Sequence, residues 1–311
     1  MTNHTSVRYF VLMGFSDDWN LHFFHAVIFL LVYLITLMGN CFIIMAVAFN
    51  HHLHSPMYFF LANLSLVDIY ICSISTTVPK SIVVSLTNNK GISFAGCVTQ
   101  IFLMVMFVGG ELALLTLMAY DRYVAICRPL HYRLIMNWNA CIQMVAISFI
   151  CNLIHAALET SVTFKLNFCG SNAIGQYFCD IPQLQKISCT DTKINQMLIF
   201  VAGFFLDSFI FIFIFVSYAY IFSTVMKMPK VKSRYKVFST CTPHLTVFFL
   251  FMTTAVFSYM RPKSLSTPSV DLLSAVLYTT LPPVLNPIIY SFRNKHLQKA
   301  LIKMLKRKSI S

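Results

Sequence analysis

The chain has 311 residues, of which 58% are hydrophobic and 11% are charged, and its formal net charge is +13. Soluble domains carry about 25% charged residues, so this composition excludes an ordinary water-soluble domain. The positive charge does not indicate a nucleic-acid partner, because most of it lies in short segments between long apolar runs.

Seven apolar runs dominate the chain, and each reaches the roughly 20 residues that a helix needs to cross a bilayer. They are too long and too uniformly apolar for the strands of a membrane β-barrel. The runs predict an all-α membrane protein, a seven-transmembrane helix bundle in a single domain over residues 1–311. Within it we assign a head at 1–22, the bundle at 23–292 and a cytoplasmic tail at 293–311. The predicted spans are residues 23–49, 57–84, 97–126, 139–165, 194–226, 236–260 and 270–292.

The distribution of basic residues predicts the orientation of the bundle. With the head outside, 15 of the 23 Lys and Arg residues lie on the inner side, as expected when basic loops stay in the cytoplasm. These clusters are placed to meet anionic lipid. We therefore expect a multi-pass protein of the plasma membrane with an extracellular N-terminus and with membrane lipid as a partner.

The head carries the triplet Asn3-His4-Thr5, which matches the acceptor pattern for N-linked glycosylation. The charge distribution independently places this triplet outside, so we predict that Asn3 is glycosylated. The head lacks a basic start that leads into an apolar run and a small-residue cleavage site. The first span is therefore expected to direct the chain to the membrane.

Two carboxylates, Asp68 in the second span and Glu111 in the third, lie near the middle of the membrane by residue count. Ionisable groups at this depth are costly and usually face a cavity or a partner. Either they fix helix packing, with a proton on an acid, or they hold a cation. Asn40 and Asn286 are polar neighbours that suit a cation site.

The outer half of the third span carries an apolar face with helical spacing. The face consists of Ile101, Met104, Val105, Val108 and Gly109. It fits either helix packing or the floor of a binding pocket. In the fourth span, His155 and Glu159 either add polar groups to such a pocket or pack and face the outer loop.

The third span ends in the string MAYDRYVAIC, residues 118–127. Arg122 follows Cys97 by 25 residues, or about 37 Å along a helix, which places Asp121 and Arg122 at the inner mouth of the bundle. On one interpretation a helix has reached the headgroups and Arg122 extends toward water. On the other, Asp121 and Arg122 form an ionic latch.

The ten cysteines divide by predicted location. Those expected outside, where the environment is oxidising, are Cys97, Cys169, Cys179 and Cys189. The others, including Cys127 and Cys241, are expected to be reduced. Four cysteines allow three pairings, and spacing does not choose among them.

The tail predicts a helix that lies along the membrane surface. Its apolar stripe consists of Leu297, Ala300, Leu301, Met304 and Leu305. Lysines fill the opposite face, which is typical of an interfacial helix. The alternative is a flexible basic tail.

Five ordered motifs resemble the olfactory (odorant) receptors, a branch of the rhodopsin-like G-protein-coupled receptors. They are PMYFFLANLSLVD at 56–68, MAYDRYVAIC at 118–127, SY at 217–218, KVFSTCTPHL at 236–245 and NPIIYSFRN at 286–294. The resemblance covers nearly the whole chain. The chain departs from the family pattern at Pro243, where Ser is usual, at Met252-Thr253, where Tyr-Gly is more common, and at Phe292, where Leu is usual. The first two departures lie on the helix that moves on activation, so basal activity is left open.

The resemblance implies an odorant receptor that binds a small volatile in the outer half of the bundle. It also implies coupling to a heterotrimeric G protein with a stimulatory, olfactory-type alpha subunit that raises cyclic AMP. The sequence carries no enzyme signature. The alternatives are a receptor for another small apolar or lipid ligand and a transporter. A transporter would predict inverted repeats or broken helices, and the sequence shows neither.

The resemblance also implies roles for individual residues. Activation and G-protein coupling are assigned to Asp121, Arg122, Tyr123, Tyr218, His244, Asn286, Pro287 and Tyr290. Odorant contact is assigned to Met104, Val105, Val108, Gly109, Ala202, Leu206, Ala255, Tyr259 and Thr279. The expected disulfides are Cys97–Cys179 and Cys169–Cys189. The resemblance favours a sodium ion at Asp68 and Glu111, and no other cofactor is expected.

Overall fold

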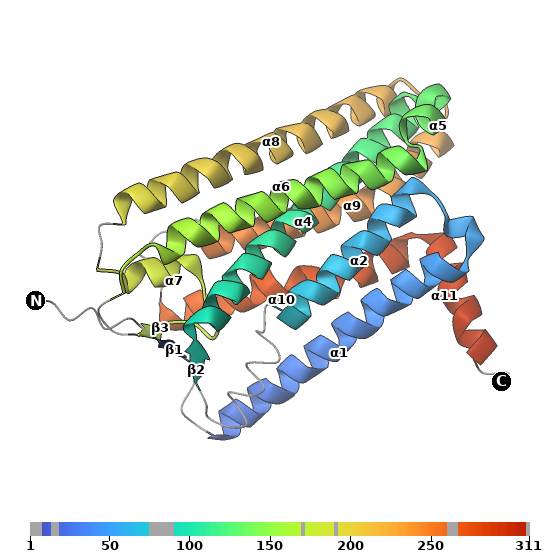
Figure 1. The fold of residues 1–311 in the computed structure, drawn as a ribbon. Helices are drawn as coiled ribbons and strands as arrows, with labels where there is room; N and C mark the ends of the chain where they lie inside the picture. The colour runs from blue at the N-terminus through green and yellow to red at the C-terminus, as the bar shows by residue number, and fades with distance from the viewer. Residues whose placement is uncertain are drawn as a thin grey trace, which may run out of the picture.

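The computed structural model describes residues 8–13, 19–74, 90–168, 172–189, 192–259 and 267–308. Within these ranges, seven helices are long and apolar enough to cross a membrane, and they run roughly along one direction (Figure 1). These helices are α1 (Trp19–Phe49), α2 (Pro56–Ile74), α4 (Phe94–Cys127), α6 (Trp138–Phe164), α8 (Lys193–Met226), α9 (Val231–Tyr259) and α10 (Pro268–Arg293). The shorter helices are η1 (His51–Leu53), η2 (Pro129–His131), α5 (Tyr132–Ile135), α7 (Ile181–Lys186) and α11 (Lys295–Lys308). The predicted seven-helix bundle is confirmed.

Most helix boundaries lie within a few residues of the predicted spans. The exception is α9, which begins at Val231 although the predicted span begins at residue 236. Hydropathy reports where a helix enters lipid, whereas the α9 helix continues into a flank that contains Lys232 and Arg234. Residues 75–84 of the second predicted span lie outside the described ranges. Pro243 lies inside α9, which remains one helix from end to end.

The helix α4 is the central element of the bundle. It packs against α2, α6, α8 and α9, and its buried residues extend from Cys97 to Val124. The helices α1, α6 and α8 instead expose large apolar side chains such as Leu31, Leu158 and Phe209. Lipid tails are as apolar as leucine, so such surfaces are stable in a membrane.

The contact between α1 and α10 depends on a glycine and on prolines. A Cβ atom added to Gly39 would lie 2.9 Å from Cγ of Pro287, so only glycine permits this approach. Pro287 has no N–H to donate to the carbonyl of Pro283, one turn earlier. The side chain of Asn40 on α1 donates to that carbonyl at 3.1 Å. A side chain of one span thus replaces the backbone bond that proline removes from another.

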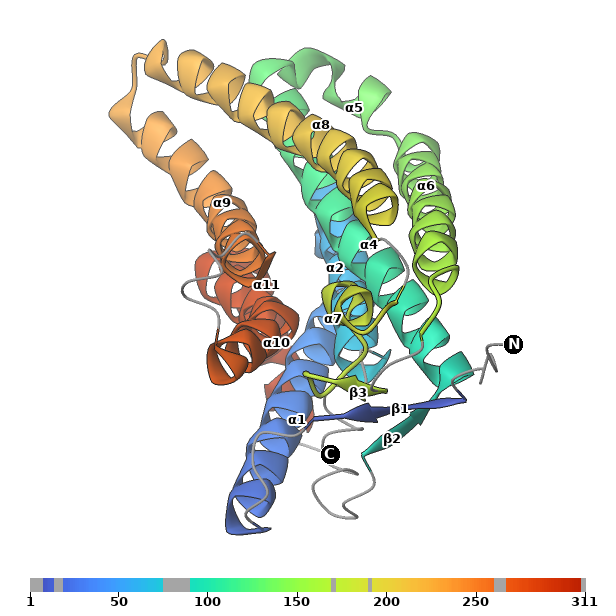
Figure 2. The same ribbon diagram turned by 90° about the vertical axis from the view of Figure 1, so that its left-hand side faces the viewer.

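A three-stranded sheet covers one end of the bundle, here named the strand end, and α11 lies at the other, here named the tail end (Figures 1 and 2). The strand β1 (Tyr9–Leu12) pairs antiparallel with β2 (Gly91–Ser93) and parallel with β3 (Ala173–Ile174). Phe10 and Leu12 alternate with more exposed neighbours and are buried. The sequence did not predict this sheet, because strands of two to four residues are too short to show a period.

The strand end is tied to α4 by the disulfide between Cys97 and Cys179, as expected. The backbone N–H of Cys179 also donates to Oε1 of Gln100 at 3.1 Å. Both cysteines pack with Phe10 and Leu12 of the sheet. The other expected pairing involves Cys169, which lies outside the described residues, as does Asn3.

We predict that replacing Cys97 and Cys179 together by alanine destabilises the folded protein. Removing a native disulfide from a small secreted domain costs about 2–5 kcal/mol, and this one joins the head strand, α4 and the segment before α7. The apparent melting temperature of the purified protein should fall. Cys151→Ala, which removes an exposed free thiol, is the control and should leave it unchanged. Equal melting temperatures for the double variant and the parent would contradict the prediction.

Candidate functional site: polar contacts through the helix bundle

Three spans meet at a pair of buried carboxylates. Asp68 on α2 and Glu111 on α4 are at most 1% exposed. Nδ2 of Asn286 on α10 lies 3.2 and 3.0 Å from the two carboxylate oxygens of Asp68 and 3.2 Å from Oε1 of Glu111. Within the described residues, neither carboxylate forms an ion pair with a basic side chain. One neutral amide therefore joins two groups that repel each other when both are ionised.

Two further oxygens make this region suitable for a cation. Oδ1 of Asn40 and Oδ1 of Asn286 are buried and have no hydrogen-bond partner within the described part of the chain. Oxygen ligands are those that hard cations prefer. The carboxylates of Asp68 and Glu111 and the amide oxygens of Asn40 and Asn286 are thus oxygen donors of the type that a sodium ion takes.

At the tail end, α4 presents an adjacent acid and base. The guanidinium of Arg122 donates to Oδ2 of Asp121, with Nε at 3.0 Å and Nη2 also in contact. The hydroxyl of Tyr132 on α5 donates to the other carboxylate oxygen at 2.6 Å. Burial and the charge of Asp121 raise the pKa of Tyr132, so this hydroxyl keeps its proton and remains a donor.

Sequence reasoning missed Tyr132, because nothing in its local pattern separates it from other tyrosines near membrane surfaces. In the structure it connects the short helix α5 to Asp121 of α4. The carboxylate thus has partners on both of its oxygens. Tyr132 therefore belongs to the same ion-pair cluster as Asp121 and Arg122.

A histidine links three spans near the same end. His244 on α9 is buried, and its Nε2 lies 2.8 Å from the carbonyl oxygen of Leu115 on α4. Its Nδ1 lies 2.7 Å from the hydroxyl of Tyr218 on α8. A carbonyl can only accept, so Nε2 carries the proton, and in the neutral ring Nδ1 accepts from Tyr218. The sequence indicated Tyr218 and His244, but it could not indicate the backbone carbonyl.

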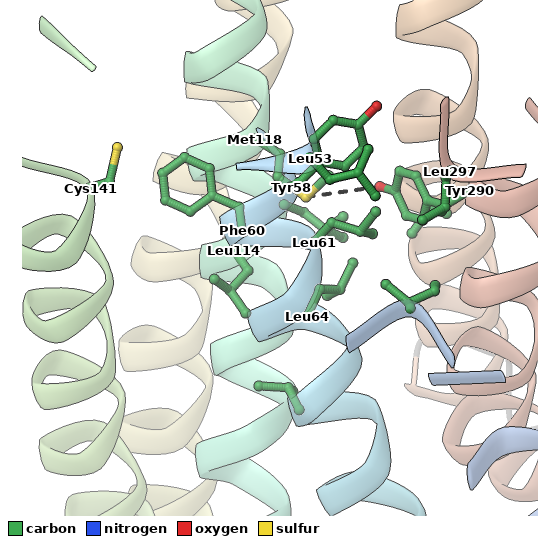
Figure 3. Packing of buried hydrophobic residues seen from close by; sticks show 14 of the residues in the cluster. Leu53, Tyr58, Phe60, Leu61, Leu64, Leu114, Met118, Cys141, Tyr290 and Leu297 are labelled. Atoms are coloured by element: carbon green, nitrogen blue, oxygen red, sulfur yellow. Dashed lines mark hydrogen bonds between the residues drawn. The ribbon is translucent and has the colours of Figure 1, made fainter. Parts of the chain in front are cut away.

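The remaining predicted activation residues lie around this linkage. The hydroxyl of Tyr290 points toward Sδ of Met118 at 4.0 Å (Figure 3). The ring of Tyr123, on α4 itself, lies 5.9 Å from the ring of Tyr220 on α8. Pro287 packs against Gly39. Tyr290 of α10 therefore contacts α4 at Met118, while Tyr123 of α4 contacts α8.

Several of the residues assigned to odorant contact share one apolar cluster. The cluster includes Met104, Val108, Leu206 and Ala255, together with Leu112, Ile210, Phe251 and Ala275. Thr279 lies beside it, 3.5 Å from the hydroxyl of Tyr177. The cluster is formed by α4, α8, α9 and α10 together with the segment before α7, and most of its side chains are apolar.

The structure places two of the assigned residues elsewhere. Val105 packs instead with the cluster that surrounds the disulfide at the strand end. A Cβ added to Gly109 would lie 2.2 Å from Oδ1 of Asn152, so Gly109 serves close packing of α4 against α6. The side chains of Ala202 and Tyr259 lie outside the described residues.

Two aromatic residues of the segment before α7 were also missed. Tyr177 and Phe178 are buried in the apolar cluster, and the ring of Tyr177 lies 5.9 Å from that of Phe29 on α1. Burial raises the pKa of Tyr177 and raises that of the neighbouring Asp180 to about 7. A connecting segment thus closes the strand end of the cluster, and no periodicity in the sequence indicates this.

The structure is that of a multi-pass membrane protein of the seven-helix receptor class. It has seven apolar helices, a polar core that joins three of them and an ion pair at one end. A sequence model of the olfactory receptor family matches residues 29–308. Olfactory receptor 14A16 of Homo sapiens is 47% identical over 308 residues, which are 99% of each chain. Olfactory receptor 14C36 of Homo sapiens is 48% identical over 307 residues, 99% of this chain and 98% of the relative. Olfactory receptor 1C1 of Homo sapiens is 46% identical over 303 residues, which cover 97% of this chain and 96% of the relative.

The chain therefore belongs to the olfactory receptor family. Members of this family are receptors, so the protein is not an enzyme. The comparisons thus confirm the family that the five sequence motifs resemble.

The histidine linkage generates a prediction about stability. His244→Phe leaves the Tyr218 hydroxyl buried without its acceptor, and an unsatisfied buried group costs about 1–3 kcal/mol. The apparent melting temperature of the purified receptor should therefore fall. Adding Tyr218→Phe should restore part of the loss, because it removes the orphaned hydroxyl. The control is Thr253→Val, which changes an exposed hydroxyl on the same helix. A further fall on adding Tyr218→Phe would contradict the linkage.

Proposed function

We propose that the protein is an odorant receptor that activates a heterotrimeric G protein with a stimulatory, olfactory-type alpha subunit and raises cyclic AMP. The proposal is carried by polar contacts of Asp68, Tyr218, His244 and Asn286, which come from four of the five sequence motifs. These contacts join α2, α8, α9 and α10 to Glu111 and to the backbone carbonyl of Leu115 on α4. Near full-length similarity to olfactory receptors supports it.

The ligand region in this proposal is the apolar cluster toward the strand end. It would accept a small volatile whose surface is mostly apolar, as small-ligand sites usually do. Tyr177 and Thr279 are the hydrogen-bonding side chains that meet at its edge. Basic residues at the tail end and the Asn3 triplet at the head support an extracellular strand end in the plasma membrane.

The G-protein side in this proposal is the tail end. Arg122 is held by Asp121, which is in turn held by Tyr132, and release of Arg122 would expose a cation to the G protein. His244 and Tyr218 join the moving α9 to α4 and α8. A hinge at Asn286-Pro287 would carry Tyr290 toward Tyr218.

Two other functions remain as alternatives. A receptor for another small apolar or lipid ligand would use the same helices and the same polar core. A transporter would need discontinuous helices at mid-membrane, whereas α2, α4 and α10 are each continuous where Asp68, Glu111 and Asn286 lie.

The proposal includes a sodium ion at the carboxylate pair. Asp68 and Glu111 would hold it with the carbonyl oxygens of Asn40 and Asn286. The ion would supply the positive charge that two buried carboxylates require. The alternative is that one acid holds a proton.

The test of the proposed function is a screen of diverse volatiles on cells that express the chain, with cyclic AMP as the readout. A concentration-dependent rise that is absent from untransfected cells is expected for at least one volatile. A response to lipids and to no volatile would favour the first alternative. Accumulation of a labelled solute by the cells would favour the transporter.

We predict that Arg122→Ala abolishes the response to a volatile that activates the parent. The substitution removes the cation that is held at the tail end by Asp121, while most packing around it stays in place. The control is Arg128→Ala, because Arg128 is exposed at the end of α4 and has no assigned role. Surface staining should be similar for parent, variant and control. If a well-expressed Arg122→Ala receptor responds as strongly as the parent, the proposed ionic latch between Asp121 and Arg122 is wrong.

A second prediction concerns the proposed sodium ion. The potency of the volatile should fall as sodium replaces an inert organic cation at fixed ionic strength, if the resting packing holds sodium better. The shift can be no larger than that difference in affinity. Glu111→Gln should reduce the dependence, whereas Glu159→Gln, which changes a carboxylate beside His155 on α6, should keep it. Identical sodium responses of parent and Glu111→Gln would show that Glu111 is not a ligand.

A further inference from the structure

Two of the sequence motifs supply a contact that the proposed function does not use. Tyr58 belongs to the string at 56–68 and Asn294 to the string at 286–294. The hydroxyl of Tyr58 on α2 donates to Oδ1 of Asn294 at 3.0 Å. Tyr58 is 7% exposed and lies close to Tyr290 and Leu297 (Figure 3). The contact therefore joins α2 to the junction between α10 and α11.

Asn294 begins the tail helix. Its backbone is extended, which separates α10 from α11. Its Oδ1 accepts from the backbone N–H groups of His296 at 3.1 Å and Leu297 at 3.2 Å. The first N–H groups of a helix have no partner within it, and Asn is among the residues that best satisfy them. The oxygen that accepts from Tyr58 is thus the same oxygen that caps α11.

The position of α11 depends on such anchoring. A 14-residue helix is only marginally stable by itself in water. Its buried side chains, Leu297 and Ala300, pack in the cluster that contains Leu53 and Tyr58. Ile302 and Lys303 are exposed on the other side. Packing holds one face of α11, and the cap determines where the helix starts.

The tyrosine hydroxyl has no role in apolar packing. A phenylalanine would fill the same space, and a buried hydroxyl destabilises the fold unless it is hydrogen-bonded. The ring of Tyr58 packs with Leu53 and Leu297, while its hydroxyl reaches the capping oxygen.

We propose that Tyr58 and Asn294 form a latch in which Tyr58 is a positioning residue for α11. The hydroxyl holds the capping oxygen of Asn294 in place, and the capping oxygen holds the first turn of α11 against α2. The latch rests on the described contacts and is independent of the proposed ligand, so the volatile screen and the latch can fail separately.

The test is hydrogen–deuterium exchange of the full-length receptor in lipid nanodiscs, followed in peptides that cover residues 295–300. In Tyr58→Phe, which keeps the ring, exchange there should become about five-fold faster, because one hydrogen bond that holds the cap is lost. Peptides from α4 and α6 should not change. The matched control is Tyr33→Phe. It removes a hydroxyl of α1 that lies 3.4 Å from Oγ of Ser73 on α2. It should leave residues 295–300 unchanged.

Variants of Asn294 distinguish a latch from general destabilisation. Asn294→Asp keeps an oxygen that can cap the helix and accept from Tyr58, so exchange should stay near the parental rate. Asn294→Ala removes both contacts and should accelerate exchange, and adding Tyr58→Phe should then have no further effect. The proposal would be overturned by any of three results. Exchange in Tyr58→Phe could equal that of the parent, Tyr33→Phe could accelerate it equally, or the accelerations of Asn294→Ala and Tyr58→Phe could add in the double variant.

Discussion

A single amide nitrogen, Nδ2 of Asn286, lies within hydrogen-bond distance of two buried carboxylates. Burying an ionised group costs several kcal/mol unless partners compensate it, so Asp68 and Glu111 are stable only while α2, α4 and α10 keep this register. Asn40 adds α1 through the carbonyl that Pro287 leaves without a donor. Four spans are therefore held by polar contacts at one depth. The large apolar surfaces of α1, α6 and α8 contact lipid and exert no comparable demand for register.

The other functional contacts are arranged along α4, the helix that carries Glu111. At the strand end, Cys97 joins it to the segment that supplies Tyr177 and Phe178. Toward the tail end, the carbonyl of Leu115 accepts from a histidine of α9. The helix α4 is continuous between these points. The proposed ligand region and the ion-pair cluster therefore lie along one continuous helix.

The sequence predicted the spans well because the ability of a segment to cross a membrane depends on the composition of that segment alone. It did not predict contacts between residues distant along the chain. Tyr132, Tyr177 and the carbonyl of Leu115 acquire their roles only when other spans approach them. The face of α4 shows the same limit, since helical spacing grouped Gly109 with Met104, whereas the structure packs Gly109 against α6. Periodicity identifies a face, but the neighbour that covers it is set by the tertiary fold.

We propose that a bound cation compensates the buried carboxylates Asp68 and Glu111, which join α2, α4 and α10. The most direct test of this proposal is the apparent melting temperature of the purified receptor in sodium chloride and in choline chloride at equal ionic strength. A cation that binds only the folded state stabilises it by mass action, so the melting temperature should rise with sodium and then saturate. The rise should be lost in Asp68→Asn. Equal melting temperatures in the two salts over the whole concentration range would show that sodium does not stabilise the folded protein.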